Sequence, residues 1–170
     1  DVSSFSCSEV GANTVILTVN DLNGNSDTAS AVVTVMDTIA PEVITQSVTV
    51  FLDATGAASI TTTEINAGSN DACGVSTIML DSTSFDCVET GANTVTLTVT
   101  DVNGNSNTAT ATVTVLDTIA PVAIAQNVTV YLDANGTASI TTSDIDNSSS
   151  DNCSIATLAL DSTSFDCGEV

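Results

Sequence analysis

Residues 93–121 read NTVTLTVTDVNGNSNTATATVTVLDTIAP. Apolar and polar residues alternate on both sides of the central Asn-Gly pair, which predicts two strands that each bury one face. Asn-Gly between two such runs is the strongest short-range signal for a β-hairpin. Pro121 cannot donate a hydrogen bond to a strand ladder, so it marks the end of the second strand. The stretch therefore predicts a β-hairpin that leads into a stiff linker.

The same pattern occurs earlier in the chain. Residues 13–41 read NTVILTVNDLNGNSDTASAVVTVMDTIAP, and Pro41 lies 80 residues before Pro121 (121 minus 41). Residues 161–170 (DSTSFDCGEV) likewise restart the text of residues 1–10 (DVSSFSCSEV). A fixed period of this length determines the architecture of the whole chain.

The period divides the chain into three parts. We expect residues 1–37 to be the C-terminal part of one repeat, residues 38–117 to be a complete repeat, and residues 118–170 to be the N-terminal part of a third. Such a chain starts and stops in mid-repeat, which we interpret as a window from a longer tandem array. Repeats of about 80 residues are small but large enough to fold.

The complete repeat carries turn signals every 8–12 residues or so, which is typical of an all-β sandwich. Before its hairpin we expect strands at residues 48–52, 58–65, 75–80 and 84–87. In the first, partial repeat we expect a short strand at residues 5–9. No segment combines a helical period with capping residues, so no helix is predicted.

The charge balance of the chain is extreme. It has 21 acidic residues and no Lys, Arg or His, for a formal net charge of −21. No basic side chain can neutralise phosphate groups, which argues against nucleic-acid binding, and an anionic membrane surface would repel the chain. No apolar run approaches the ~20 residues of a membrane span. The chain has no His for acid–base catalysis and no Lys for Schiff-base chemistry, and its Asp residues lie in turns that recur with the repeat. We therefore predict that it is not an enzyme.

The hairpin and linker resemble those of a known group of repeats. Asp-x-Asn-Gly-Asn followed at this spacing by Asp-Thr-x-Ala-Pro is similar to the closing hairpin and linker of hyalin (HYR) repeats and related bacterial immunoglobulin-like repeats. The loops at residues 71–73 (DAC) and 151–153 (DNC) also resemble a loop of those repeats. The resemblance covers all 170 residues as parts of three units. It implies tandem immunoglobulin-like β-sandwiches on secreted or cell-surface proteins, with a role in adhesion or spacing.

Acidic and amide residues are expected to meet where one repeat joins the next. In an immunoglobulin-like topology the loop after the second strand and the turn of the final hairpin lie at the end where the chain enters. Carboxylate and amide oxygens are the ligands that Ca²⁺ prefers, six to eight at a time. We therefore expect junctional Ca²⁺ sites. The candidate ligands are Asp37, Asp71, Asp101, Asn103 and Asn105, the counterparts Asp117 and Asp151, and Asp21, Asn23, Asn25 and Asp27 of the first hairpin turn.

Ordinary turn chemistry is the alternative explanation of these residues. A type I′ turn requires Asn-Gly, and flanking Asp or Asn side chains cap such a turn locally. The absence of basic residues favours a bound cation, because the self-repulsion of this many carboxylates destabilises a compact fold.

The five cysteines recur at fixed repeat positions without a CxxC pair, which favours disulfides and an oxidising compartment. Cys73 and Cys87 flank a short crossover, and a hairpin-like return there would bring them together. We expect the disulfides Cys73–Cys87 and Cys153–Cys167, with Cys7 bonded to a residue before the sequence. Pairing between subunits and free thiols are the alternatives.

Threonines share one face of the predicted hairpin, at Thr94, Thr96 and Thr98 and again on the return strand. A flat threonine array can bind ice or polysaccharide, but the pattern favours a solvated outer sheet face made of residues with high β-propensity. Asn127, Asn135 and Asn147 match the N-glycosylation pattern, which matters only in a suitable host.

These observations predict a structural region of an extracellular surface protein: a stalk, an adhesin shaft or a filament. Its partners would be neighbouring repeats of the same protein, and Ca²⁺ would fix the angle between them. The alternative is a Ca²⁺-dependent module that binds glycans or ice. Aromatic residues, which sugar sites need, make up only 3 % of the chain, which favours the structural role.

Overall fold

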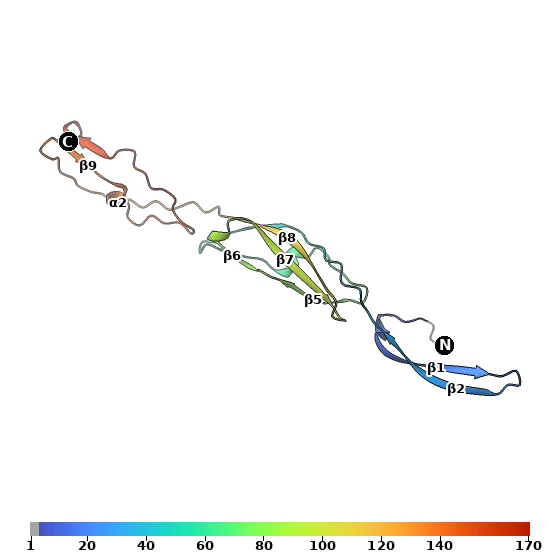
Figure 1. Cartoon of the computed structure of the whole chain (residues 1–170). Coiled ribbons are helices and arrows are strands. Elements are labelled where there is room, and N and C mark those ends of the chain that lie inside the picture. The colour runs from blue at the N-terminus through green and yellow to red at the C-terminus, as the bar shows by residue number, and fades with distance from the viewer. Residues whose placement is uncertain (1–3) are drawn as a thin grey trace. The chain divides into compact units, whose positions relative to one another are not determined.

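The structure is a computed structural model that describes residues 4–170. Strands make up most of its regular structure (Figure 1). They are β1 (Gly11–Asn20), β2 (Ser26–Val35), β3 (Val48–Phe51), β4 (Ala57–Ser59), β5 (Val75–Leu80), β6 (Ser84–Asp86), β7 (Gly91–Asp101), β8 (Ser106–Leu116), β9 (Thr137–Ser139) and β10 (Ser164–Asp166). The helical turns in the described range are α1 (Thr62–Ile65), α2 (Thr142–Ile145), η1 (Cys7–Glu9), η2 (Cys87–Glu89) and η3 (Cys167–Glu169). The predicted all-β class is confirmed at this level.

The chain forms two compact units, and neither follows a continuous stretch of sequence. Unit 1 contains residues 4–48, 60–83 and 94–112, and unit 2 contains residues 49–59, 84–93 and 113–170. The largest sheet has the strand order β3-β8-β7-β5, so the hairpin β7–β8 supplies its two central strands (Figure 1). Sequence reasoning identified that hairpin but not which strands would flank it.

The core of unit 1 forms against one face of β7. Val95, Leu97 and Val99 are completely buried, while the threonines between them remain partly exposed. Ile60 and Ile65 are buried in the same unit. The antiparallel pairing of β7 with β5 explains this burial, because alternate residues of a paired strand point to opposite faces. The predicted alternation of apolar-in and threonine-out is confirmed for this strand.

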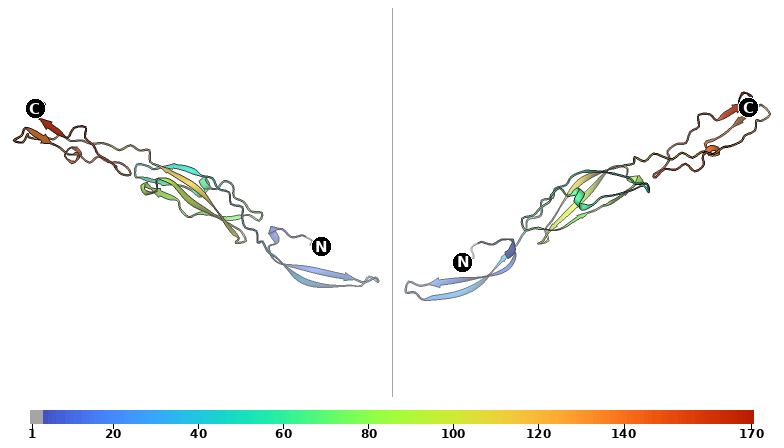
Figure 2. Two further views of the ribbon diagram at one scale, coloured as in Figure 1. Left: turned by 45° about the horizontal axis from the view of Figure 1, so that its top comes forward. Right: turned by 180° about the vertical axis from the view of Figure 1, so that it is seen from behind.

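Unit 1 also contains the hairpin β1–β2, whose strands lie side by side in both views of Figure 2. They pair antiparallel from Gly11 opposite Val35 to Asn20 opposite Ser26. Within residues 4–170 this sheet consists of two strands. Its apolar side chains remain exposed to solvent: Leu17 is 64 % exposed and Val19 is 59 % exposed. A two-stranded sheet cannot bury both faces by itself.

Unit 2 contains the short pairs β4–β6 and β9–β10. Its core consists of Leu52, Phe85, Val113 and Val115, all less than 5 % exposed. The backbone N–H of Leu52 donates to the carbonyl of Leu116 over 2.9 Å, which fixes the chain after β3 beside the end of β8.

Two segments of unit 2 have strand-like sequences but form no strand. Residues 128–131 correspond to β3, and residues 155–160 correspond to β5, one repeat later. In the four-stranded sheet these strands pair with the hairpin β7–β8. A strand exists only where its backbone groups find a partner strand. β9 and β10, which pair with each other, form in full.

The strand predicted at residues 58–65 is wrong beyond its first residues. β4 ends at Ser59, and residues 62–65 form the helical turn α1. A capping box begins the turn: the backbone N–H of Thr61 donates to the Glu64 carboxylate over 2.7 Å, and the Thr61 hydroxyl donates to the same oxygen over 2.8 Å. The Thr-x-x-Glu signal was present in the sequence, but a single turn is too short to show a helical period.

The short strands predicted at residues 5–9 and 84–87 also need correction. Residues 7–9 form η1, and β6 ends at Asp86, directly before η2 begins at Cys87. Ser6 and Asp86 cap these 3₁₀ turns with their side chains. Both positions carry a Glu three residues later that completes a capping box.

Candidate junction sites

Two disulfides link positions 66 residues apart. Cys7 is bonded to Cys73 with Cα atoms 5.1 Å apart, and Cys87 is bonded to Cys153 with Cα atoms 5.3 Å apart. The prediction of disulfides is confirmed, but the predicted pairs Cys73–Cys87 and Cys153–Cys167 are wrong. Cys7 was predicted to pair with a residue before the sequence, and it pairs with Cys73 instead. Cys167 is exposed and free.

The error has a physical cause. The predicted pairing needed β5 and the next strand to return on each other like a hairpin. Instead β5 pairs with β7 and β6 pairs with β4, so the chain crosses between sheets after Leu80. Cys73 and Cys87 therefore belong to different units. The observed pairs share a spacing of 66 residues, but the predicted pairs also share one spacing, so spacing could not select between them.

We define the first junction as Asp37, Asp71, Cys73, Asn103 and Asn105, all in unit 1. The linker residue Asp37 accepts a hydrogen bond from Asn103 Nδ2 to its carboxylate over 2.8 Å, and its carbonyl accepts one from Asn105 Nδ2 over 3.3 Å. The turn of the hairpin β7–β8 thus holds the linker that precedes the repeat.

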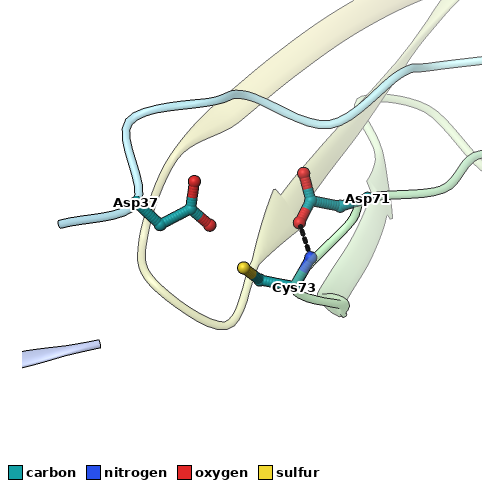
Figure 3. A group of neighbouring side chains, drawn as sticks. All are labelled: Asp37, Asp71 and Cys73. Carbon is teal, nitrogen blue, oxygen red and sulfur yellow. Dashed lines mark hydrogen bonds between the residues drawn. The ribbon is translucent and has the colours of Figure 1, made fainter. Parts of the chain in front are cut away.

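Two carboxylates face each other at the first junction (Figure 3). One oxygen each of Asp37 and Asp71 and the sulfur of Cys73 lie within 4.8 Å of one another. The Cys73 sulfur is bonded to Cys7 and cannot serve as a thiolate ligand. Asp71 also accepts the backbone N–H of Cys73 over 2.8 Å, the dashed line in Figure 3. Like charges this close repel by about 1 kcal/mol even at the dielectric constant of water.

Asp101 closes the turn between β7 and β8. Its Oδ1 accepts the backbone N–H groups of Asn103 and Asn105 over 2.9 and 2.8 Å, and its Oδ2 accepts Asn105 Nδ2 over 2.8 Å. Only 2 % of Asp101 is exposed. Burial raises the pKa of this carboxyl, but the hydrogen bonds from Asn105, Asn103 and Gly104 outweigh it, so the pKa lies below its ordinary value.

The first hairpin turn has the same internal bonds. Asp21 accepts the backbone N–H groups of Asn23 and Asn25 over 2.9 and 2.8 Å and the Asn25 side-chain amide over 2.7 Å. Asp27 accepts the N–H of Thr28 over 2.9 Å. The carboxylate oxygens of Asp21 are thus used within the turn, as in ordinary turn chemistry.

We define the second junction as Asp117, Asp151, Asn152, Cys153 and Asp53, all in unit 2. Asn152 Nδ2 donates to Asp117 Oδ1 and to the carbonyl of Asp53, both over 3.2 Å. Asp151 Oδ2 accepts the N–H of Cys153 over 3.0 Å. The linker residue Asp117 is therefore held as Asp37 is, but by a different amide.

Two oxygen atoms of the second junction are buried without a hydrogen-bond partner in the described part of the chain. They are Oδ1 of Asp151 and Oδ1 of Asn152. A buried acceptor without a donor destabilises the fold by about 1–3 kcal/mol. A cation or water is the usual partner for such a pair.

Sequence reasoning missed Asn152 and Asp53 as junction residues. Asn152 occupies the position of Ala72 in the first junction, so the repeat comparison gave no reason to select it. Asp53 takes part through its backbone carbonyl, which any residue would supply. Neither contact leaves a signal in residue type and spacing.

Comparison with models of known families and with curated proteins gives no match. No helix in residues 4–170 is both long and apolar enough to cross a membrane.

Proposed function

We propose that this chain is part of a tandem array of immunoglobulin-like β-sandwich repeats, each of about 80 residues, that serves as a stalk, adhesin shaft or filament of an extracellular surface protein. The observation that supports it best is the disulfide pattern. With the repeat bounds given above, Cys7–Cys73 links the first repeat to the second, and Cys87–Cys153 links the second to the third. Disulfides that join successive repeats restrict bending between them.

The compartment follows from the same bonds. Disulfides persist in oxidising surroundings, which favours a secreted or cell-surface location. A net charge of −21 keeps such an array soluble at high local density. The outward threonines of β7 give the sheet a polar outer face.

Each junction combines three restraints. The disulfide closes a 66-residue separation, which in the chain-entropy model contributes about 4 kcal/mol. The proline of the linker limits its backbone conformations. Side-chain amides from the repeat, Asn103 at the first junction and Asn152 at the second, hold the linker aspartate. Together these restraints would transmit tension and orientation from one repeat to the next.

Ca²⁺ would add a fourth restraint. At the first junction Asp37 and Asp71 would hold it, and at the second Asp117, Asp151 and Asn152 would, with water completing six to eight oxygens. The orphaned oxygens of Asp151 and Asn152 and the facing carboxylates of Asp37 and Asp71 fit a hard cation. So few protein ligands suggest an affinity of about 10⁻⁴–10⁻³ M, the range of extracellular modules.

The test removes the restraint between the second and third repeats. The double variant Cys87→Ser/Cys153→Ser should lower the melting temperature and, in small-angle scattering, broaden the distribution of particle dimensions. Cys167→Ser is the matched control, because that thiol is free, and it should change neither quantity. Each protein is measured with Ca²⁺ and with chelator at equal ionic strength.

The outcomes separate the parts of the proposal. If the double variant melts and scatters like the unmodified chain, the junction is not a mechanical element and the structural role fails. If Ca²⁺ changes nothing while the disulfide does, the shaft stands without a metal, and the acidic residues act as ordinary turn and linker acceptors.

A further inference from the structure

Asn-Gly pairs occur at three places in the chain: Asn23-Gly24, Asn103-Gly104 and Asn135-Gly136. Asparagine is a thermally labile residue, because the backbone nitrogen of the next residue can attack its side-chain amide. Glycine has no side chain to hinder that approach, so we expect the reaction to be fastest at these three pairs. The pairs are alike in sequence, and only the surroundings of each amide distinguish them.

The amide of Asn103 binds a residue that is distant in the sequence. Its Nδ2 donates to the Asp37 carboxylate over 2.8 Å, and we call this hydrogen bond the linker clamp. The other side-chain bond from this turn to Asp37 is longer, because Asn105 Nδ2 lies 3.3 Å from the Asp37 carbonyl. A bond to a charged acceptor is stronger than one to a neutral carbonyl. Both ends of the linker clamp lie within residues 37–105, so the clamp does not depend on residues beyond either end of the sequence.

The other two pairs have no such contact. Asn135 Nδ2 donates over 3.2 Å to Asp133, a residue of its own turn. Asn23 donates its backbone N–H to Asp21 over 2.9 Å, and its side chain has no hydrogen-bond partner within residues 4–170. In this part of the chain, Asn103 is thus the residue of the three whose amide holds a segment outside its own turn.

The nitrogen that would attack Asn103 is accessible. Gly104 has a φ of +95°, and a Cβ atom added there would meet nothing within 4 Å. Its N–H donates to the Asp101 carbonyl over 3.4 Å, a long bond that holds the nitrogen only weakly. The side chain of Asn103 is exposed, so water can reach it.

We propose that Asn103 is a deamidation site and that its reaction is a one-way switch at the first junction. While the linker clamp is formed, it restrains the amide and slows the reaction. Once the amide has reacted, the clamp cannot form again. The inference rests on the proposed function in treating the junction as a restraint between repeats, but it requires neither Ca²⁺ nor an extracellular location.

The reaction needs water and no other co-reactant. The backbone nitrogen of Gly104 bonds to Cγ of Asn103 and closes a succinimide ring. The Cγ–Nδ2 bond breaks, and Nδ2 leaves as ammonia after taking up the proton that the Gly104 nitrogen loses. Water then adds to one of the two ring carbonyls and opens the ring, which leaves aspartate or isoaspartate at this position. NH is exchanged for O, and nothing is oxidised or reduced.

The linker clamp opposes the first step. Ring closure requires the Asn103 side chain to turn toward the backbone nitrogen of Gly104, whereas its Nδ2 is anchored on Asp37. Giving up a hydrogen bond to a charged group before the reaction should slow it about tenfold. The rate at Asn103 therefore depends on how often the linker leaves the turn, and the product records that opening.

The product reverses the interaction at the junction. A carboxylate replaces the amide that donated to Asp37, so a hydrogen bond becomes a repulsion between like charges at the same place. The carboxylate of Asp71 already faces Asp37 there (Figure 3). The bond from Asn105 to the Asp37 carbonyl is the side-chain bond that remains between this turn and Asp37. The linker is then held more weakly, and the change is permanent.

The first test compares two substitutions that add the same charge at equivalent turn positions. Asn103→Asp should lower the melting temperature by about 3–8 °C in the presence of chelator, because it removes the linker clamp and adds repulsion. Asn23→Asp is the matched control: it also adds one carboxylate two residues after an aspartate, but no linker carboxylate binds it. It should lower the melting temperature clearly less. Asn103→Ala removes the donor without adding charge and should give an intermediate value.

The second test measures the reaction itself in the full chain. The protein is incubated at neutral pH with chelator, below its melting temperature, and digested beside acidic residues, because it has no Lys or Arg for trypsin. Mass spectrometry then follows the exchange of NH for O at each asparagine. Asn103 should react about tenfold more slowly than Asn23.

Removing the acceptor should abolish that protection. Asp37→Ala should raise the rate at Asn103 to that at Asn23 and leave Asn23 unchanged, whereas a general loosening of the fold would raise both rates. Asp37→Asn keeps an acceptor oxygen without the charge and should give an intermediate rate at Asn103.

Two results would overturn the proposal. Equal rates at Asn103 and Asn23 in the unmodified chain, or an Asn103 rate that both Asp37 variants leave unchanged, would show that the linker clamp does not control the reaction. Equal melting temperatures for Asn103→Asp and Asn23→Asp would show that deamidation does not weaken the junction. Neither result bears on the effect of Cys87→Ser/Cys153→Ser, so the proposed function would stand or fall separately.

Discussion

Asp101 shows how one carboxylate can organise a turn in a chain that has no basic side chains. It accepts two backbone N–H groups and one side-chain amide from the loop that it closes, and it is nearly completely buried. These donors stabilise the charged form more than burial destabilises it, so the pKa of Asp101 is lowered. Its contribution to stability therefore depends on ionisation.

We predict that Asp101→Asn lowers the melting temperature at pH 7 and that this difference shrinks in acid. A carboxyl whose pKa is lower in the folded state stabilises the fold above its unfolded pKa, and this stabilisation is lost as pH falls through the folded pKa. The window lies below about pH 4. Melts of both proteins from pH 7 down to about pH 3 measure the difference; a constant difference would show that charge is not what matters.

Gly56 lies against the disulfide of the second junction. Its φ is +77°, and a Cβ atom there would meet Cys87 Sγ at 2.7 Å and the carbonyl oxygen of Asn152 at 2.8 Å. Both neighbours are fixed, one by the disulfide and the other as backbone. No side chain fits without displacing the junction.

Gly56→Ala should therefore destabilise the chain by about 2–4 kcal/mol, from left-handed backbone strain plus the clash. Gly104→Ala is the matched control: φ is +95° but nothing lies within 4 Å of the added atom. Its cost should be only about 1–2 kcal/mol. Chemical denaturation of both variants gives the comparison, and equal losses would mean that the contact with Cys87 is unimportant.

Among elements, the strands of this chain form only where partners are present. β3 and β5 flank the hairpin β7–β8, whereas the equivalent residues 128–131 and 155–160 form no strand. The sequences are closely similar, so local propensity does not decide between the two outcomes. Backbone hydrogen bonding to a neighbouring strand decides whether such a segment forms a strand.

The same contrast yields a matched pair of substitutions. Leu97 is completely buried, and its counterpart Leu17 is 64 % exposed. Leu97→Ala should cost about 2–5 kcal/mol because it leaves a cavity. Leu17→Ala should cost less than about 0.5 kcal/mol in the monomer. Chemical denaturation of both variants measures the two losses; similar costs would refute the assignment of Leu97 to the core.

At the scale of the whole molecule, unbalanced charge dominates. With 21 acidic residues and no basic ones, every charge–charge interaction between side chains is repulsive. The fold resists this repulsion through two disulfides, a small aliphatic core and turns that use carboxylates as acceptors.

Salt should therefore stabilise the chain. The Debye length falls from about 30 Å at 0.01 M to about 3 Å at 1 M, so added NaCl screens repulsion between carboxylates. We predict that the melting temperature rises steadily with NaCl. Tetramethylammonium chloride is a suitable control for specific ion binding and should act like NaCl at equal ionic strength. A flat or falling melting temperature would mean that the repulsion is already neutralised.

The expectation that Asp37 lies near Asn103 came from an assumed immunoglobulin-like topology, and the hydrogen bond between them agrees with it. The sequence by itself determined the all-β class, the hairpin β7–β8 and the 80-residue spacing. These depend on side-chain alternation, on turn residues and on a period, which are all local or repeated along the chain. The sequence also indicated disulfides, since the cysteines recur at fixed positions without a CxxC pair.

Only the tertiary structure decided which cysteines pair, which strands form and where a helical turn replaces a strand. Cys7 reaches Cys73 because β5 and β6 enter different sheets, and sheet partners are a long-range property that spacing does not encode. Asn152 became a junction residue through a contact with Asp117, 35 residues away. Such contacts depend on where the packed backbone places each side chain, so residue type alone could not reveal them.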